Sequence, residues 1–285
     1  MSGANASPTR SASAEARSLN EGRSQQLMTT LQAQREIQEP VFGPYDSRRF
    51  GKSLGVNPLP AGARLCNFDC VYCECATASW PLQWELRPQF PTAEQIRQGM
   101  IAASERFGAD DLDSITIAGN GEPTLSPHIA EIVDVISECR DRDWPQARTV
   151  ILTNGSTVHK RSVGAALAKL DCRVVKLDAG TNWTLDELNR PGEKLGVSEL
   201  VRRISMLPDI IIQSMFVHGP VDNTGPHEVE AWTAWLEKLE PQSVQIYSLD
   251  RMPAKPWVRP VPRVELEVIA AYVEANAGIR AQVFC

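Results

Sequence analysis

Four of the seven cysteines of this 285-residue chain lie within eleven positions, in the stretch LCNFDCVYCEC at residues 65–75. Cys66, Cys70 and Cys73 form a C-x3-C-x2-C pattern. Thiolates are soft ligands that suit zinc or an iron–sulfur cluster. Three thiolates on one loop fit a [4Fe–4S] cluster in which one iron keeps an open coordination position, whereas a structural zinc site needs a fourth ligand.

The remaining metal-ligating residues do not supply that fourth ligand in any recognisable pattern. The histidines are scattered, at positions 128, 159, 218 and 227, and no second C-x2-C pair follows. The pattern therefore favours an iron–sulfur cluster over zinc and over unliganded core thiols. Cys75 lies outside the triad and is interpreted as a free or packing thiol, with a second-cluster ligand or a catalytic thiol as the alternatives.

Composition limits where such a site can work. No apolar run approaches the ~18–20 residues of a membrane span, and the first thirty residues lack the apolar core of a secretory signal. We therefore expect a cytoplasmic protein with no membrane partner, in which clustered cysteines serve metal binding or chemistry. The net charge of −6 provides no general basic field and disfavours a nucleic-acid partner.

The elements that must position these residues alternate between strands and helices. Residues 1–40 are polar and are predicted to form a disordered tail, and residues 41–285 are predicted to form one domain. Strands are expected at 53–56, 114–119, 148–153, 172–180, 209–217, 243–249 and 280–284, and helices at 91–108, 127–141, 159–170, 197–206, 226–240 and 262–277. This alternation predicts an α/β fold, a partial (βα)6 TIM-like barrel with parallel strands, whose functional residues follow the strands.

Polar and glycine-rich segments follow several of the expected strands. AGNGEPTL (118–125) follows the strand SITI, LTNGS ends the next strand at Asn154, and KLDAGT places Asp178 at the end of a third. Each could be an ordinary turn between a strand and a helix. Gln213 lies inside an apolar strand, where a ligand contact and a satisfied core amide are equally good interpretations.

Taken with the aromatic residue Tyr72, the cysteine loop C-x3-C-x-Y-C resembles that of the radical S-adenosylmethionine (SAM) superfamily. The resemblance implies that Cys66, Cys70 and Cys73 hold a [4Fe–4S] cluster, whose open iron is chelated by SAM. It also implies that the enzyme cleaves SAM reductively and generates a 5′-deoxyadenosyl radical. Tyr72 is then expected to pack near the adenine.

The same resemblance assigns roles to the strand ends. The loop at 118–125 is similar to the superfamily's G-G-E motif, with Asn120 in place of the usual glycine, so that Gly119, Gly121 and Glu122 are expected near the SAM amino group. Asn154 is expected near the ribose, as is Asp178, which has substrate contact as its alternative. Gln213 completes the expected SAM-binding set.

The stretch from VFGP at residue 41 to the last strands resembles one bacterial and archaeal branch of the superfamily, related to the enzyme that makes the tricyclic wyosine base in tRNA. The substrate is not identified by this resemblance, and a reductant such as flavodoxin or ferredoxin is implied. A tRNA-base-modifying enzyme and a non-catalytic zinc or iron–sulfur module are the alternatives.

Two further groups have open interpretations. Arg48, Arg49 and Lys52 form a small basic group that is either a solvated face or an anion site for a carboxylate or phosphate substrate. Tyr247 lies near the end of the strand expected at 243–249, and Asp250 and Arg251 follow it; a salt-bridged rim and a substrate contact are both compatible with the sequence.

Overall fold

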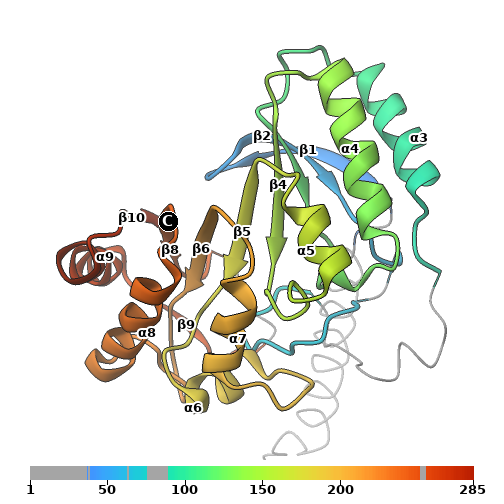
Figure 1. Cartoon of the computed structure of the whole chain (residues 1–285). Coiled ribbons are helices and arrows are strands. Elements are labelled where there is room, and N and C mark those ends of the chain that lie inside the picture. Colours follow the sequence, from blue (N-terminus) through green and yellow to red (C-terminus); the bar gives the residue numbers. More distant parts are fainter. Residues whose placement is uncertain (1–36, 38, 63, 76–88, 251–254) are drawn as a thin grey trace, which may run out of the picture. The chain divides into compact units, whose positions relative to one another are not determined.

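The computed structural model describes residues 37, 39–62, 64–75, 89–250 and 255–285. These residues belong to one compact unit, Glu36–Cys285. They form an eight-stranded sheet in the order β1-β2-β3-β4-β5-β6-β8-β10 and a two-stranded sheet of β7 and β9. The large sheet curls into a half-barrel, with helices on its outer side (Figure 1).

All neighbouring strands from β2 to β10 in the large sheet run parallel, and only β1 pairs antiparallel, with β2. The strands are β1 (Val41–Ser47), β2 (Gly51–Val56), β3 (Ser114–Ile117), β4 (Arg148–Thr153), β5 (Cys172–Lys176), β6 (Ile210–Met215), β7 (Val217–His218), β8 (Ser243–Tyr247), β9 (Arg259–Pro260) and β10 (Ala281–Phe284). Parallel neighbours need crossover connections, which the helices supply.

The helices follow the strands in the order expected for βα units. They are α3 (Ala93–Ser104), α4 (Ile129–Asp143), α5 (Arg161–Leu167), α6 (Asn182–Thr184), α7 (Val197–Ile204), α8 (Pro226–Leu239) and α9 (Arg263–Ala277), with a 3-10 turn η1 (Pro123–Leu125) and a π-helical turn η2 (Leu185–Asn189). The start of α3 is fixed by a capping box in which Thr92 and Gln95 each accept a hydrogen bond from the other's backbone.

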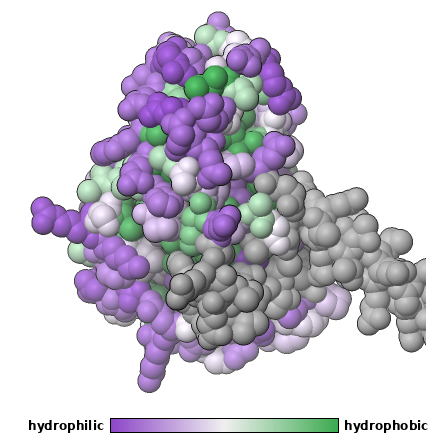
Figure 2. All heavy atoms as spheres, turned by 90° about the vertical axis from the view of Figure 1, so that its right-hand side faces the viewer, coloured by the Kyte–Doolittle hydropathy of each residue, from purple (hydrophilic) through white to green (hydrophobic). Residues whose placement is uncertain are grey.

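The two faces of the sheet carry different cores, because side chains alternate along a strand. Ile151 and Val175 belong to the large core shared with the helices, whereas Val150 and Val174 belong to a smaller cluster on the concave face. Figure 2 shows the side on which α3 and α4 lie, which is largely hydrophilic, as expected of helices that bury one face. None of the described helices is long and apolar enough to cross a membrane.

The β1–β2 hairpin reaches across the concave face. Phe50, at its tip, is buried against Val150 and Val174. The neighbouring Arg48 forms an ion pair of 3.3 Å with Asp250, which follows β8 several strands away in the sheet. The hairpin tip therefore joins the two sides of the concave face. Arg251, which follows Asp250, lies outside the described residues.

The structure confirms the predicted partial barrel and its parallel strands. The antiparallel β1, the small β7–β9 sheet and the π-helical turn were not predicted, because each depends on pairing between distant segments or on an irregular turn. The expected tail at 1–40 lies almost entirely outside the described residues.

The position of Phe50 generates a prediction. Phe50→Ala should lower the free energy of unfolding by about 3–5 kcal/mol, because it removes a ring that is 4% exposed and leaves a cavity under the hairpin. Tyr45→Ala, on the same hairpin but 61% exposed, should cost less than about 1 kcal/mol. Denaturant unfolding of both variants measures the difference, and equal costs would show that the hairpin tip is not packed on the sheet.

Candidate active site

The cysteine stretch forms a loop at the carboxyl edge of the sheet, directly after β2. A single parallel bridge joins Leu65 of this loop to Gly121 of the loop after β3. The Leu65 N–H donates to the Asn120 carbonyl at 2.7 Å, and the Glu122 N–H donates to the Leu65 carbonyl at 3.0 Å. The two sequence motifs are therefore held side by side by backbone hydrogen bonds.

This close approach explains the glycine at position 121. Its φ is +141°, a conformation that residues with a side chain rarely adopt. A Cβ there would lie 1.9 Å from the Leu65 carbonyl oxygen. Gly119 has a similar restriction, since a Cβ would lie 2.1 Å from the Asn57 Oδ1 atom. Both glycines are thus required by contacts inside the chain.

Cys66, Cys70 and Cys73 are half-buried free thiols, and N–H groups point at two of their sulfur atoms. The Phe68 backbone N–H donates to the Cys66 sulfur at 3.4 Å, and the Asn189 side-chain amide donates to the Cys70 sulfur at 3.4 Å. Such donors stabilise thiolates and metal-bound sulfur over the neutral thiol. Among the described residues, no group of three His, Cys, Asp or Glu side chains is arranged so that it could hold a metal ion as it stands.

A buried cation lies beside the thiols. The Arg64 side chain is 3% exposed, pairs with Asp69 at 3.1 Å and donates to the Phe68 carbonyl at 3.0 Å. Burial acts to lower the pKa of Arg64, but the three cysteines of the triad, led by Cys73, raise it above its usual value. The loop therefore carries its own positive charge next to three groups that become anionic when they bind metal.

The thiols differ in acidity because their surroundings differ. Burial raises the pKa of Cys66 and raises that of Cys70 to about 11, with the neighbouring thiols acting in the same direction. A hydrogen bond from Cys75 lowers the pKa of Cys73 to about 6, while that of Cys75 itself is raised. The structure thus gives Cys75 a role as a hydrogen-bond partner of Cys73.

Glu122 links the loop at 118–125, called the glycine loop below, to the end of β4. Its carboxylate is 2% exposed and accepts four hydrogen bonds, from the Thr124 N–H and hydroxyl, from the Thr153 hydroxyl at 2.6 Å and from the Asn154 N–H at 2.7 Å. Burial raises the pKa of Glu122, and these donors oppose that rise. The Glu122 carboxylate, which was expected near the SAM amino group, thus already accepts hydrogen bonds from residues of its own chain.

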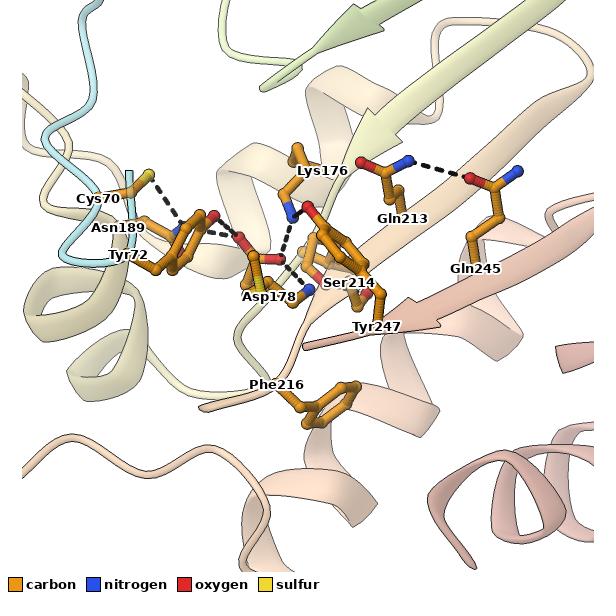
Figure 3. Close-up of polar contacts among 12 residues, drawn as sticks. Cys70, Tyr72, Lys176, Asp178, Asn189, Gln213, Ser214, Phe216, Gln245 and Tyr247 are labelled. Carbon is orange, nitrogen blue, oxygen red and sulfur yellow. Dashed lines mark hydrogen bonds and ion pairs between the residues drawn. The ribbon is translucent and has the colours of Figure 1, made fainter. Parts of the chain in front are cut away.

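Asp178 links the cysteine loop to β5 and β6 (Figure 3). Its fully buried carboxylate accepts from the Tyr72 hydroxyl, the Asn189 amide at 2.7 Å and the Met215 N–H at 2.7 Å, and it pairs with Lys176 at 2.8 Å. Tyr72 and Asp178, which lie far apart in the sequence, are thus direct neighbours. Tyr72 is itself 8% exposed, so its ring is packed under the loop.

Asn154 and Gln213 occupy different surroundings. Asn154 donates to Asn67 of the cysteine loop at 2.9 Å and lies 4.0 Å from the Cys66 sulfur, so it belongs to the same group. Gln213 donates to Gln245 on the neighbouring strand at 3.0 Å, away from Asp178 in Figure 3. The structure brings all the predicted residues to this end of the sheet except Gln213, which lies deeper on the concave face.

Sequence reasoning missed Lys176, Asn189 and Arg64. Lys176 had a usable signal, because it lies two positions before Asp178 in the strand expected at 172–180, where alternation places both on one face. Asn189 lies in the π-helical turn η2, which has no comparable signal. Arg64 is separated by one residue from the first cysteine and could have been singled out as a cation beside thiolates.

The bridge between the two loops is testable. Gly121→Ala should destabilise the protein by roughly 3–5 kcal/mol, because backbone strain and the clash with Leu65 act together. Gly278→Ala is the matched control, since its φ is +66° but a Cβ there meets nothing within 4 Å, and it should cost only about 1 kcal/mol. Denaturant unfolding compares them; an equally small cost for both would mean that the loops do not approach as described.

Residues 62–182 match the model of the Radical SAM superfamily. This range contains the cysteine loop, the glycine loop and Asp178. A UPF0026 protein of Methanocaldococcus jannaschii is 27% identical over 242 residues, which cover 82% of this chain and 71% of the relative.

Two solved structures share the fold. SuiB of Streptococcus suis bound to S-adenosylmethionine superposes with a TM-score of 0.58 at 13% identity, covering 78% of this chain and 49% of SuiB, so this chain spans about half of SuiB. TYW1 with a lysine–pyruvate adduct bound superposes with a TM-score of 0.52 at 13% identity, covering 79% of this chain and 74% of TYW1. The family match, the half-barrel and the position of the cysteine loop agree: residues 62–182 form a radical SAM domain, the domain of a superfamily whose members are enzymes.

Proposed function

We propose that Cys66, Cys70 and Cys73 hold a [4Fe–4S] cluster and that the enzyme uses SAM to generate a 5′-deoxyadenosyl radical. The observation that carries this proposal is the set of three free thiols on one loop after the first parallel strand, bridged to the glycine loop. When bound, the cluster supplies the electron for the reductive cleavage of SAM. The protein's task is to hold, orient and shield the reactants.

The residues around the thiols fit such a group. Two sulfur atoms receive N–H donors, and Arg64 places a buried positive charge beside them. Hydrogen bonds to sulfur and local charge are the features by which proteins tune iron–sulfur clusters. Cys75, which lies beside Cys73, is left outside the proposed ligand set because the three-cysteine pattern is complete without it.

We assign SAM binding to Tyr72, Gly119, Gly121, Glu122, Asn154, Asp178 and Gln213. Within this set, Glu122 and Asp178 act by positioning other residues of the site. Glu122 acts by fixing the glycine loop and Asn154, since its carboxylate already accepts four hydrogen bonds. Asp178 likewise orients Tyr72 beneath the cysteine loop.

The proposal also covers the electron donor and the compartment in which the enzyme works. The electron donor is a small reductant such as flavodoxin or ferredoxin, and the enzyme works in the cytoplasm, where exposed thiols stay reduced. The substrate's reaction, and whether SAM is consumed or regenerated, are not assigned.

Modification of a tRNA base, as in wyosine synthase, is the alternative within the enzyme class. TYW1 has a related fold, but the net charge of this chain is −6 and Asp250 neutralises Arg48. Phosphate contacts dominate nucleic-acid affinity, so this charge distribution disfavours a tRNA substrate. A non-catalytic metal module is the alternative from another class; the polar residues that gather at successive strand ends, such as Glu122, Asn154 and Asp178, favour the enzyme over it.

The ligand assignment gives a direct prediction. Replacing Cys66, Cys70 or Cys73 by Ala should each abolish cluster loading, because a [4Fe–4S] cluster with one open iron needs all three thiolates. Anaerobically purified wild-type protein should be brown and contain about four irons per chain. Cys75→Ala is the control and should keep its iron. Equal iron loss from Cys75→Ala would show that the ligands are misassigned, and a colourless zinc protein would contradict the proposal.

The glycine loop gives a second prediction. Glu122→Gln should weaken SAM binding by about 10- to 150-fold, equivalent to roughly 1.5–3 kcal/mol, because it removes charge-assisted hydrogen bonds that hold Asn154 and the loop. Glu131→Gln, an exposed change in the first turn of α4, should leave the affinity unchanged. Anaerobic calorimetric titration with SAM measures both. Wild-type affinity in Glu122→Gln would remove this loop from the SAM site.

A further inference from the structure

Two cations contact the same aromatic ring on the concave face of the half-barrel. The Arg49 guanidinium, from the hairpin tip, lies 4.8 Å from the centre of the Tyr247 ring, and the Lys176 ammonium lies 4.6 Å from it. Lys176 ends β5 and Tyr247 ends β8, so three separate segments of the chain contribute to this group. Arg49, Lys176 and Tyr247 belong neither to the proposed cluster ligands nor to the proposed SAM-binding residues.

The two cations differ in how their charge is balanced. Lys176 pairs with Asp178 at 2.8 Å and donates to the Tyr247 hydroxyl at 2.8 Å. Burial acts to lower the pKa of Lys176, but Asp178 raises it, so the ammonium is retained. Its charge is therefore compensated within the protein.

Arg49 has no such compensation among the described residues. Its Nε and Nη1 atoms are buried and have no hydrogen-bond acceptor in this part of the chain, and no described carboxylate pairs with it. Burial lowers the pKa of Arg49; Tyr247 opposes that fall, and the neighbouring Arg48 adds to it. Burying these two nitrogens without acceptors costs free energy, since their lost hydration is not replaced.

The neighbouring Arg48 shows that the hairpin does not need Arg49 as an anchor. Arg48 is 39% exposed and already joins the hairpin to Asp250. Phe50, on the other side of Arg49, supplies the apolar packing. The two unpaired nitrogens of Arg49 therefore point to a ligand that supplies hydrogen-bond acceptors, and the positive charge of the guanidinium favours an anion.

Further donors lie beside it. The Tyr247 oxygen accepts from Lys176, which leaves the phenol hydrogen to donate. Gln213 lies opposite Lys176 on the neighbouring strand and pairs with Gln245, so amide groups extend the polar surface along the concave face. The Lys176–Asp178–Tyr72 contacts connect this surface to the cysteine loop.

We propose that Arg49, Lys176 and Tyr247 form the substrate's anion-binding site, which takes the carboxylate or phosphate group of a small anionic substrate. A planar guanidinium with two adjacent N–H groups is suited to hold such oxygens in a bidentate manner. The inference rests on the proposed function, because it names the substrate class for the same concave face.

The test uses full-length, cluster-loaded protein, purified anaerobically, with acetate and inorganic phosphate as probes. Thermal unfolding is followed while either anion replaces chloride at constant ionic strength. Wild-type protein should gain at least about 2 °C in a saturable manner with one of the probes, because an anion that binds only the folded state stabilises it. The probe that acts distinguishes a carboxylate site from a phosphate site.

Three variants make the result specific. Arg49→Gln should abolish the thermal stabilisation by the anion. Arg49→Lys keeps the charge but loses the two adjacent N–H groups of the guanidinium, so it should weaken apparent binding at least about fivefold. Arg48→Gln should respond as the wild type does. No anion-specific gain in wild type, or a wild-type response in Arg49→Gln or Arg49→Lys, would overturn the inference.

The proposed function is checked separately, by release of 5′-deoxyadenosine from SAM by the reduced wild-type protein. An Arg49-dependent anion response without this release would refute the proposed function and keep the site. Release without the anion response would refute the site alone.

Discussion

The backbone bridge between Leu65 and Gly121 is the constraint on which the candidate site depends. Two loops that follow neighbouring strands can approach this closely only because position 121 has no side chain. The bridge fixes the start of the cysteine loop over the sheet edge. Glu122, the next residue, then fastens the pair to the end of β4. Three strand ends are thus held together by contacts within the chain.

At the carboxyl edge of the sheet, buried charged side chains have partners of opposite charge, whereas Arg49 on the concave face has none in the part of the chain that the structure describes. Asp178 pairs with Lys176, and Arg64 pairs with Asp69 beside the thiols. Burying these ions is tolerated because each has a partner. Arg49 departs from this pattern among the described residues, and a departure that costs stability is most simply explained by a ligand.

The sequence predicted what local patterns determine. The strand expected at 148–153 follows from its run of β-branched and apolar residues, and the structure confirms it. The grouping of the cysteines with the glycine loop was implied by the resemblance to the radical SAM superfamily, and the structure brings the two loops together. The contact of Tyr72 with Asp178 and the reach of Arg49 to Tyr247 could not be predicted, because they depend on how the curled sheet brings distant segments together. Glu122 shows the same limit, since its partners Thr153 and Asn154 belong to the next strand and its end.

The central claim is that the loop held by this bridge presents an iron–sulfur cluster with one open iron to SAM. Electron paramagnetic resonance of the anaerobically reduced protein, recorded before and after SAM is added, tests it most directly. The account predicts the signal of a reduced [4Fe–4S] cluster whose shape changes when SAM is added, because the new ligand alters the environment of the open iron. A reduced cluster whose signal is identical with and without saturating SAM would contradict the account.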